Sequence, residues 1–173
     1  DSFGIDVPKA KSEGATKKAT ERATKALALE ENYSKYNDDS ITGMIDGGAN
    51  SSTGSAGDTV NLQGMEDAVV VSLDQSYADA DLYIQGIEQM NANADTTNTL
   101  VGTSSVNTWE VNAQNAGEIN AIVFTAFANL IGRGGVDTFG FTDAGALDGF
   151  VDGGDQPAST RDVVDMSELS DVN

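Results

Sequence analysis

The chain of 173 residues contains no cysteine and no histidine. These absences exclude disulfide bonds, thiol and imidazole nucleophiles, imidazole general bases and the ordinary zinc sites built from such side chains. Aromatic residues make up 6% of the chain, and no apolar run approaches the roughly 20 residues that span a membrane. We therefore expect a soluble protein that does not insert into a membrane and that has few means of catalysis.

Positive charge is scarce as well, and it is concentrated in one segment. The chain has 9 basic and 28 acidic residues, which gives a formal net charge of -19. All the basic residues except Arg133 and Arg161 lie between residues 9 and 37, so the rest of the chain is strongly acidic. An acidic surface repels nucleic acids and anionic lipids and attracts cations. We therefore expect no nucleic-acid partner.

What the chain does contain is an internal repeat. Residues 1–7 and 41–62 recur, with substitutions, within residues 137–166, and Asp46-Gly-Gly48 returns as Asp152-Gly-Gly154. The period is roughly 105 residues, and such a period is typical of arrays whose units bury their apolar faces against neighbours. The first copy is interrupted after Val7 by an insertion of about 30 residues.

The insertion at residues 8–37 predicts one helix, from about Ser12 to Tyr33. Its alanines and charged residues favour helix, and acidic and basic residues recur four positions apart. An alanine at every fourth position gives a narrow, shallow apolar stripe that suits docking onto a surface. We expect this basic helix to lie on the acidic β surface of its own chain or of a neighbouring copy. The residues expected to make the contact are Lys17, Lys18, Arg22, Lys25, Leu27 and Tyr33.

The rest of the chain has short apolar runs separated by Gly, Asn, Asp, Ser and Thr, which indicate short strands and tight turns. The predicted strands are residues 41–45, 59–62, 68–73, 82–87, 99–101, 108–111, 119–124, 138–141, 147–151 and 163–166. This spacing is typical of either a coiled parallel sheet or an antiparallel β-sandwich. Asn-rich and Thr-rich segments such as residues 91–98 favour the coiled sheet, because their side chains hydrogen-bond the backbone of sharp corners.

Two acidic turns are candidate metal sites, one with Asp46 and Asp58 and the other with Asp152, Asp155 and Asp162. Carboxylates beside flexible glycine turns are the kind of ligand that Ca²⁺ takes. The same aspartates can instead cap their turns by accepting backbone N–H groups. Neither copy completes the Gly-Gly-x-Gly-x-Asp pattern of tandem calcium repeats. Ca²⁺ is the one cofactor that the sequence suggests, and the two interpretations stay open.

Catalysis and sugar binding have weaker support. Carboxylate pairs hydrolyse glycosides, but with 28 acidic residues some pair, such as Asp79 and Asp81, falls at a useful spacing by chance. Aromatic residues could stack on sugars or fill a core, and the alternation of Phe139 and Phe141 around Gly140 favours a core. The aromatic residues in question are Trp109, Phe124, Phe127, Phe139, Phe141 and Phe150. We therefore expect that the protein is not an enzyme.

An ordered series of short segments resembles a known kind of repeat. The series is Asn107-Thr-Trp-Glu-Val111, Asn115-Ala-Gly117, Phe124-Thr-Ala-Phe-Ala-Asn-Leu-Ile-Gly132, Gly135-Val-Asp-Thr-Phe139 and Leu147 to Gly154. It is similar to the repeat region of giant bacterial surface adhesins, which have filamentous-haemagglutinin-like or haemolysin-type repeats. The resemblance covers most of residues 38–173 together with residues 1–7, and it leaves the basic insertion outside.

The resemblance implies a mainly β chain in which residues 1–173 form one right-handed β-solenoid segment, located outside the cell at the bacterial surface. It implies a structural repeat of a long adhesin or filament that mediates surface attachment or subunit assembly without catalysis. The implied partners are neighbouring copies of the same protein and host or matrix glycans. The alternatives are a calcium-binding or glycan-binding module and a polysaccharide-degrading β-helix enzyme.

Overall fold

The computed structural model describes residues 43–48, 57–156 and 158–170, all within one unit that spans residues 40–173. These residues are mainly β, as the sequence predicts, and the described part of the chain contains no helix, so none that could cross a membrane. The helix predicted at residues 12–33 lies outside the described residues. So do the predicted contact residues Lys17, Lys18, Arg22, Lys25, Leu27 and Tyr33.

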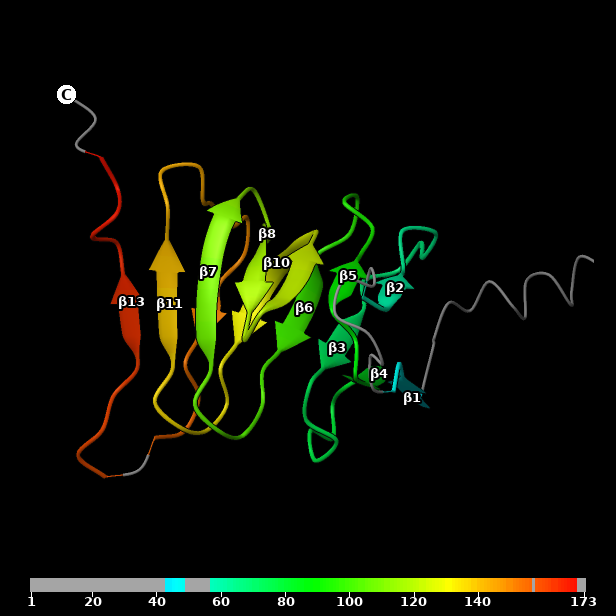
Figure 1. Ribbon diagram of the computed structural model, residues 1–173, viewed down its shortest axis with the longest axis horizontal. Helices are drawn as coiled ribbons and strands as arrows, with labels where there is room; N and C mark the ends of the chain where they lie inside the picture. The colour runs from blue at the N-terminus through cyan, green and yellow to red at the C-terminus, as the bar shows by residue number, and fades with distance from the viewer. Residues whose placement is uncertain (1–42, 49–56, 157, 171–173) are drawn as a thin grey trace, which may run out of the picture. The chain divides into compact units, whose positions relative to one another are not determined.

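The described residues form thirteen strands in two sheets (Figure 1). The six-stranded sheet, called the first sheet below, has the order β1-β4-β3-β6-β10-β12. Its strands are β1 (Gly43–Asp46), β3 (Val70–Ser72), β4 (Leu82–Gln85), β6 (Asn98–Val101), β10 (Phe127–Ile131) and β12 (Val151–Asp152). The second sheet has the order β13-β11-β7-β8-β9-β5-β2. Its strands are β2 (Thr59–Asn61), β5 (Gln89–Asn91), β7 (Thr108–Ala113), β8 (Ala116–Ile119), β9 (Ile122–Thr125), β11 (Thr138–Phe141) and β13 (Val163–Asp165).

Nearly all neighbouring strands are parallel. Every pairing in the first sheet is parallel, and in the second sheet only β8 runs antiparallel to its neighbours, β7 and β9. Parallel neighbours need a crossover between them, whereas a hairpin joins antiparallel ones. The antiparallel sandwich, which the strand spacing left open, therefore does not describe these sheets.

The chain repeatedly passes from the first sheet to the second. The strand pairs β1–β2, β4–β5, β6–β7, β10–β11 and β12–β13 are each consecutive in sequence, and each has one strand in either sheet. We call such a pair a rung. The rungs β1–β2 and β12–β13 lie at the opposite edges of both sheets, as Figure 1 shows for β1, β2 and β13.

The strand predicted at residues 119–124 is wrong, because a turn interrupts it. Asn120 and Ala121 have φ values of 48° and 69°, and positive φ at both central residues is typical of a tight two-residue hairpin loop. Asparagine tolerates positive φ but alanine rarely adopts it, so Asn120-Ala121 is a weaker turn signal than the usual Asn-Gly pair. Similarly, Ala126 at φ 63° separates β9 from β10 inside one apolar run. The sequence did not predict β5 or β10, and the strand predicted at residues 147–151 is confined to Val151–Asp152.

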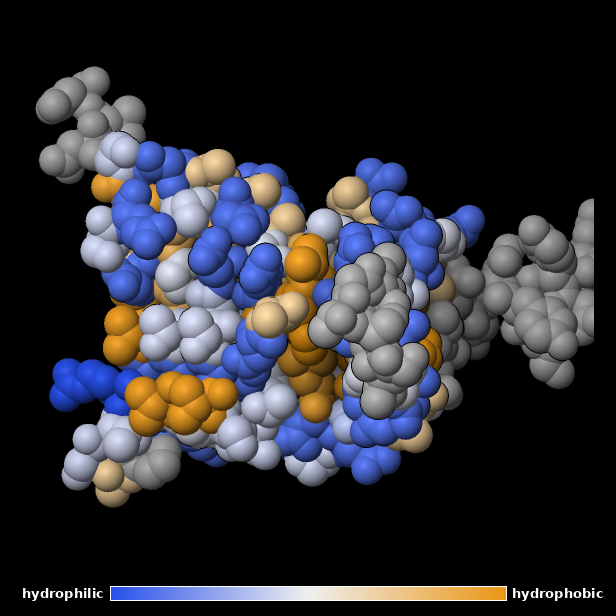
Figure 2. All heavy atoms as spheres, viewed as in Figure 1, coloured by the Kyte–Doolittle hydropathy of each residue, from blue (hydrophilic) through white to orange (hydrophobic). Residues whose placement is uncertain are grey.

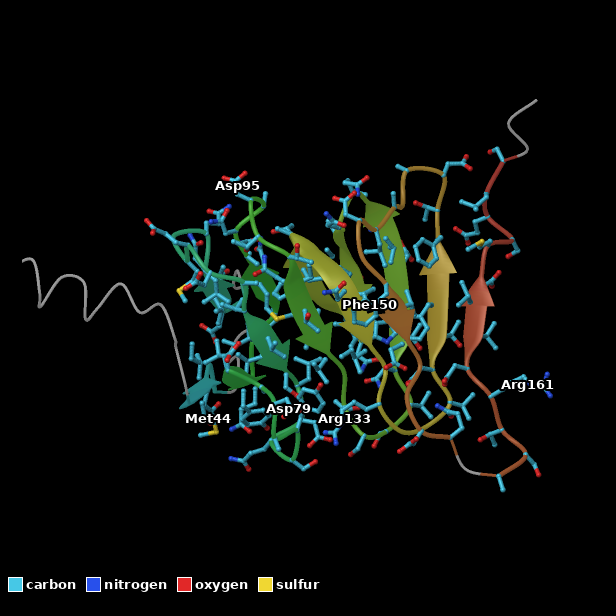
Figure 3. The ribbon with its side chains drawn as sticks, turned by 180° about the vertical axis from the view of Figure 1, so that it is seen from behind. Met44, Asp79, Asp95, Arg133, Phe150 and Arg161 are labelled. Carbon is cyan, nitrogen blue, oxygen red and sulfur yellow. The ribbon has the colours of Figure 1, made fainter. Side chains whose placement is uncertain are left out.

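Buried apolar side chains from both sheets form one core cluster. Trp109 stacks on Phe139 with ring centroids 5.4 Å apart, and it meets Phe124 edge to face. The core interpretation is confirmed for the buried aromatic residues Trp109, Phe124, Phe127 and Phe139 and for Phe141, which packs against the cluster. It is wrong for Phe150, which is half exposed and is labelled in Figure 3.

Candidate functional site: corner ladders and two copies of one rung

A repeated pair of residues marks the corner where the chain passes from the first sheet to the second. A glycine follows the first strand, and an Asp or Asn precedes the second. The pairs are Gly47 with Asp58, Gly102 with Asn107, Gly132 with Asp137, and Gly153 with Asp162. A Cβ added to Gly132 or Gly153 would lie 2.3 or 2.0 Å from the carboxylate of its pair. The Asp or Asn side chain therefore folds over the glycine, where a larger residue would clash.

Hydrogen bonds connect these corners from rung to rung. The Asn107 N–H donates to Asp137 Oδ1 over 2.6 Å, and the Asp137 N–H donates to Asp162 Oδ1 over 2.8 Å. At the other edge of the sheet, the Asp58 N–H donates to Glu88 Oε2 over 2.7 Å. A corner side chain thus satisfies a backbone donor of the adjacent rung, which would be costly to bury without a partner. Each rung therefore supplies hydrogen-bond acceptors that the adjacent rung needs.

Asp137 is the carboxylate of this ladder that is most removed from water. Its side chain is fully buried, and its Oδ2 has no hydrogen-bond partner among the described residues. Burial raises the pKa of Asp137, hydrogen bonds from Asn107 oppose the rise, and the charge of Asp162 adds to it. A Cβ added to Gly132 would lie 2.3 Å from this Oδ2 and 2.9 Å from the Gly153 carbonyl oxygen, so both oxygens lie close to Gly132. Because its pKa is raised, Asp137 keeps its proton to a higher pH in the native state than in the unfolded chain.

A second corner is held by an ion pair. Arg133 Nη1 lies 2.9 Å from Asp74 Oδ2, and the guanidinium carbon lies 5.1 Å from the centroid of the Tyr77 ring. Ser76 and Ser104 donate further hydrogen bonds to the Asp74 carboxylate. Burial alone would raise the pKa of Asp74, but these hydrogen bonds and the charge of Arg133 lower it to about 2. The ionised carboxylate therefore ties together loops from three parts of the chain.

The predicted metal ligands are Asp46, Asp58, Asp152, Asp155 and Asp162. Asp46 and Asp152 each accept the N–H of the residue two positions later, over 2.8 and 2.9 Å, which is the turn-capping role. Asp162 accepts hydrogen bonds from Asp137 and from Gln156 Nε2. Within the described ranges, no three Asp or Glu side chains gather into a metal-binding group. Calcium binding stays a prediction.

The sequence-based reasoning missed the ladder residues Asn107, Asp137 and Glu88. A signal was present, because each stands directly before an apolar run that forms a strand of the second sheet. Of the carboxylates considered for catalysis, Asp81 accepts the Val70 N–H over 2.8 Å, and Asp79 is exposed. The structure does not bring the predicted site residues of the two acidic turns together, because the turns belong to opposite edge rungs.

A cleft of about 600 Å³ is lined largely by Asn, Gln, Ala and Thr residues. Two of its residues, Asn115 and Asp148, exchange hydrogen bonds of 2.7 and 2.8 Å. A third, Asn93, donates to the Met65 carbonyl over 2.6 Å. These polar groups hold adjacent loops together, which favours a structural role for the cleft lining over ligand binding.

The two copies of the internal repeat form the two edge rungs. Residues 41–62 include β1 and β2, and residues 147–166 include β12 and β13. The Asp-Gly-Gly turns also match in conformation, since Gly48 and Gly154 have φ values of 79° and 81°. The same motif therefore adopts the same local structure at both edges of the two sheets.

Comparison of the chain with protein-family models, with curated protein sequences and with solved structures gives no match.

Proposed function

We propose that this chain is a structural repeat of a long extracellular adhesin or filament protein of the bacterial surface. In this role it mediates attachment or subunit assembly without catalysis. The observation that carries the proposal is that one repeated motif forms both edge rungs of the two sheets. Units whose two ends carry the same rung are suited to serial stacking, and stacking produces extended molecules.

The finer fold that we propose is a right-handed β-solenoid. Its support is the nearly complete parallel pairing, the five rungs that pass between the same two sheets, and the corner ladder of Asn107, Asp137 and Asp162. The right hand is proposed because crossovers between parallel strands of one sheet are almost always right-handed. The antiparallel strand β8, and β4 lying between β1 and β3, interrupt the regular coil locally.

A role without catalysis is supported by how the polar and aromatic side chains are used. The corner carboxylates accept backbone N–H groups, and the largest aromatic rings lie in the core. Both uses serve rigidity and stacking. The adhesin resemblance in the sequence points in the same direction.

The test of this proposal is the shape of the natural protein that contains the chain. Electron microscopy should show rods or filaments, and compact globular particles would contradict the proposal. Heat released on titration with Ca²⁺ or with glycans would favour a binding module instead. Release of reducing ends from acidic polysaccharides would favour an enzyme.

A further inference from the structure

The two copies of the repeat differ in the exposure of equivalent apolar side chains. In the first copy, Val60, Leu62 and Met65 are at most 9% exposed. Their equivalents in the second copy are Val164, Met166 and Leu169, which are at least 41% exposed. Figure 2 shows apolar side chains at the surface along the edge where β13 lies.

This difference does not come from a different local structure. The Gln63 N–H donates to Asn61 Oδ1 over 3.0 Å, and at the equivalent position the Ser167 N–H donates to Asp165 Oδ1 over 2.9 Å. Two positions further on, the amides of Met65 and Leu169 each bond the carbonyl three residues earlier, over 3.0 and 3.1 Å. The two copies therefore share their strand and the turn that follows it.

The difference is also confined to one part of the rung. Met44 and Phe150 are equivalent positions of the two copies and are labelled in Figure 3. They are 53% and 51% exposed, so these outward-facing side chains are equally open to solvent in the two copies. The core-facing pair Ile45 and Val151 packs against the core in both copies, so the loss of burial is confined to β13 and the turn that follows it.

In the first copy the neighbouring rung is β4–β5, whereas in the second copy it is β10–β11, so within the described residues each edge rung is paired on one side and open on the opposite side. Val60 pairs with Met90, which is fully buried, and Asp46 pairs with Gln85, whose side-chain amide donates to Asp46 Oδ2 over 2.6 Å. Glu88 accepts the corner N–H described above. The backbones also approach closely, because a Cβ added to Gly86 would lie 2.5 Å from the Gly48 carbonyl oxygen.

We infer that the open side of β12–β13 is a docking surface for a second copy of the repeat unit, whose rung Leu82–Asn91 pairs with it in parallel. The inference rests on the proposed function and names the surface and the partner. By the register of the first copy, Val164 pairs with Met90 of the second copy and Asp152 with Gln85. The Asp162 N–H donates to Glu88 of the second copy, and the absence of a Cβ on Gly86 of the second copy lets that residue approach the Gly154 backbone, as Gly86 approaches Gly48 in the first copy.

The second copy contributes its residues from Gln63 onward. In the assembly, β12–β13 takes the place that β1–β2 holds against β4–β5, so each shared rung ends one unit and begins the next. The match extends to the turns, because Asp46 and Asp152 cap theirs in the same way. A partner of unrelated sequence would offer neither the carboxylate at the Glu88 position nor the glycine at the Gly86 position.

The test is a tandem chain in which residues 63–173 are appended after Met166 of the sequence, which continues the period without a linker. The amides of Asp162 and Met166 should then exchange with solvent at least about 100-fold more slowly than in the single chain, because both become ladder donors. The tandem chain should also resist denaturant at least as well as the single chain.

A disulfide test checks the register, and it is clean because the chain has no cysteine. V163C in the first copy should cross-link to Q89C in the second, since their equivalents Thr59 and Gln89 are register partners. The control pair, V163C with N91C of the second copy, lies two residues out of register and beyond the reach of a disulfide. Equal cross-linking of both pairs would overturn the inference.

V164D provides a matched control for the buried face. In the single chain the Val164 side chain is half exposed, so V164D should change the free energy of unfolding little. In the tandem chain the same substitution should remove the protection of the Asp162 amide from exchange.

Unchanged amide exchange between single and tandem chains, or a tandem chain less stable than the single one, would overturn the docking surface. If electron microscopy of the natural protein nevertheless shows rods, the proposed function still holds. If it shows compact particles while the junction amides of the tandem chain are protected, the proposed function is wrong and the docking surface is confirmed.

Discussion

Residues 41–62 and residues 147–166 form equivalent rungs at opposite edges of the same two sheets, with the same turns. The first rung pairs with β4–β5 and the second with β10–β11, so within the described residues the side of β12–β13 that corresponds to the β4–β5 side of the first rung is open. The burial of a repeat therefore depends on its neighbour. Substitutions at equivalent positions should therefore have unequal effects, and the inequality can be measured.

The largest difference in the free energy of unfolding is expected when a charge is placed at equivalent positions of β2 and β13. V60D buries an unpaired carboxylate against Met90 and should lower the free energy of unfolding by about 4 kcal/mol. V164D places the same carboxylate at a half-exposed site and should cost less than about 1 kcal/mol. Urea denaturation of the two variants measures both values, and equal losses would contradict the comparison.

Adding a methyl group at the equivalent corner glycines Gly47 and Gly153 tests whether the two rungs also differ in how closely a neighbouring backbone approaches them. In G47A the added Cβ would lie 2.0 Å from the Gly86 carbonyl oxygen, so the backbone of the adjacent rung must move. In G153A it would lie 2.0 Å from Asp162 Oδ2, so that carboxylate must shift and its hydrogen bonds from Asp137 and Gln156 weaken, while the backbone can stay in place. We expect losses of about 3 and about 1 kcal/mol in thermal or chemical denaturation. In the tandem chain, G153A should become as costly as G47A.

D137N tests the corner ladder of Asn107, Asp137 and Asp162 through the pH dependence of stability. Burial raises the pKa of Asp137 above its ordinary value of 3.8, so the native state holds a proton that the unfolded chain releases. Stability is therefore lost as the pH rises from the ordinary value through the raised pKa. Asparagine keeps a donor at every pH, as Asn107 does. Denaturation should show D137N more stable by about 1 kcal/mol at pH 7 and little changed at pH 3.

D162N is the control for this prediction. It keeps an oxygen that can accept the Asp137 N–H and removes the charge that adds to the raised pKa. It should weaken the loss of stability with rising pH without abolishing it. A D137N protein that is less stable than the unmodified chain at pH 7 would show that Asp137 acts there as a carboxylate.

The smallest effects are expected at the outward-facing positions. M44A and F150A remove equivalent side chains with nearly equal exposure, 53% and 51%. Each should change the free energy of unfolding by less than about 1 kcal/mol, and the two changes should be similar. Strongly unequal values in the same urea titrations would mean that the outer surroundings of the two rungs also differ.

Much of the fold could be predicted because its signals are local. The mainly β class and the turns at Asp46 and Asp152 follow from short apolar runs and from the Asp-Gly-Gly sequence. The hairpin at Asn120 and Ala121 could not be predicted, because alanine at positive φ is imposed by the surrounding strands. The exposure of Phe150 could not be predicted either, because a short apolar segment does not show which of its side chains face the core.

Local sequence dictates that two segments of this chain adopt the same turns, because turn geometry depends on a few adjacent residues. It did not determine which segment would be covered. That was decided by pairing between residues about 30 positions apart, such as Val60 with Met90 and Asp58 with Glu88. Only the tertiary structure places these partners together, and burial depends on the partner as much as on the residue itself.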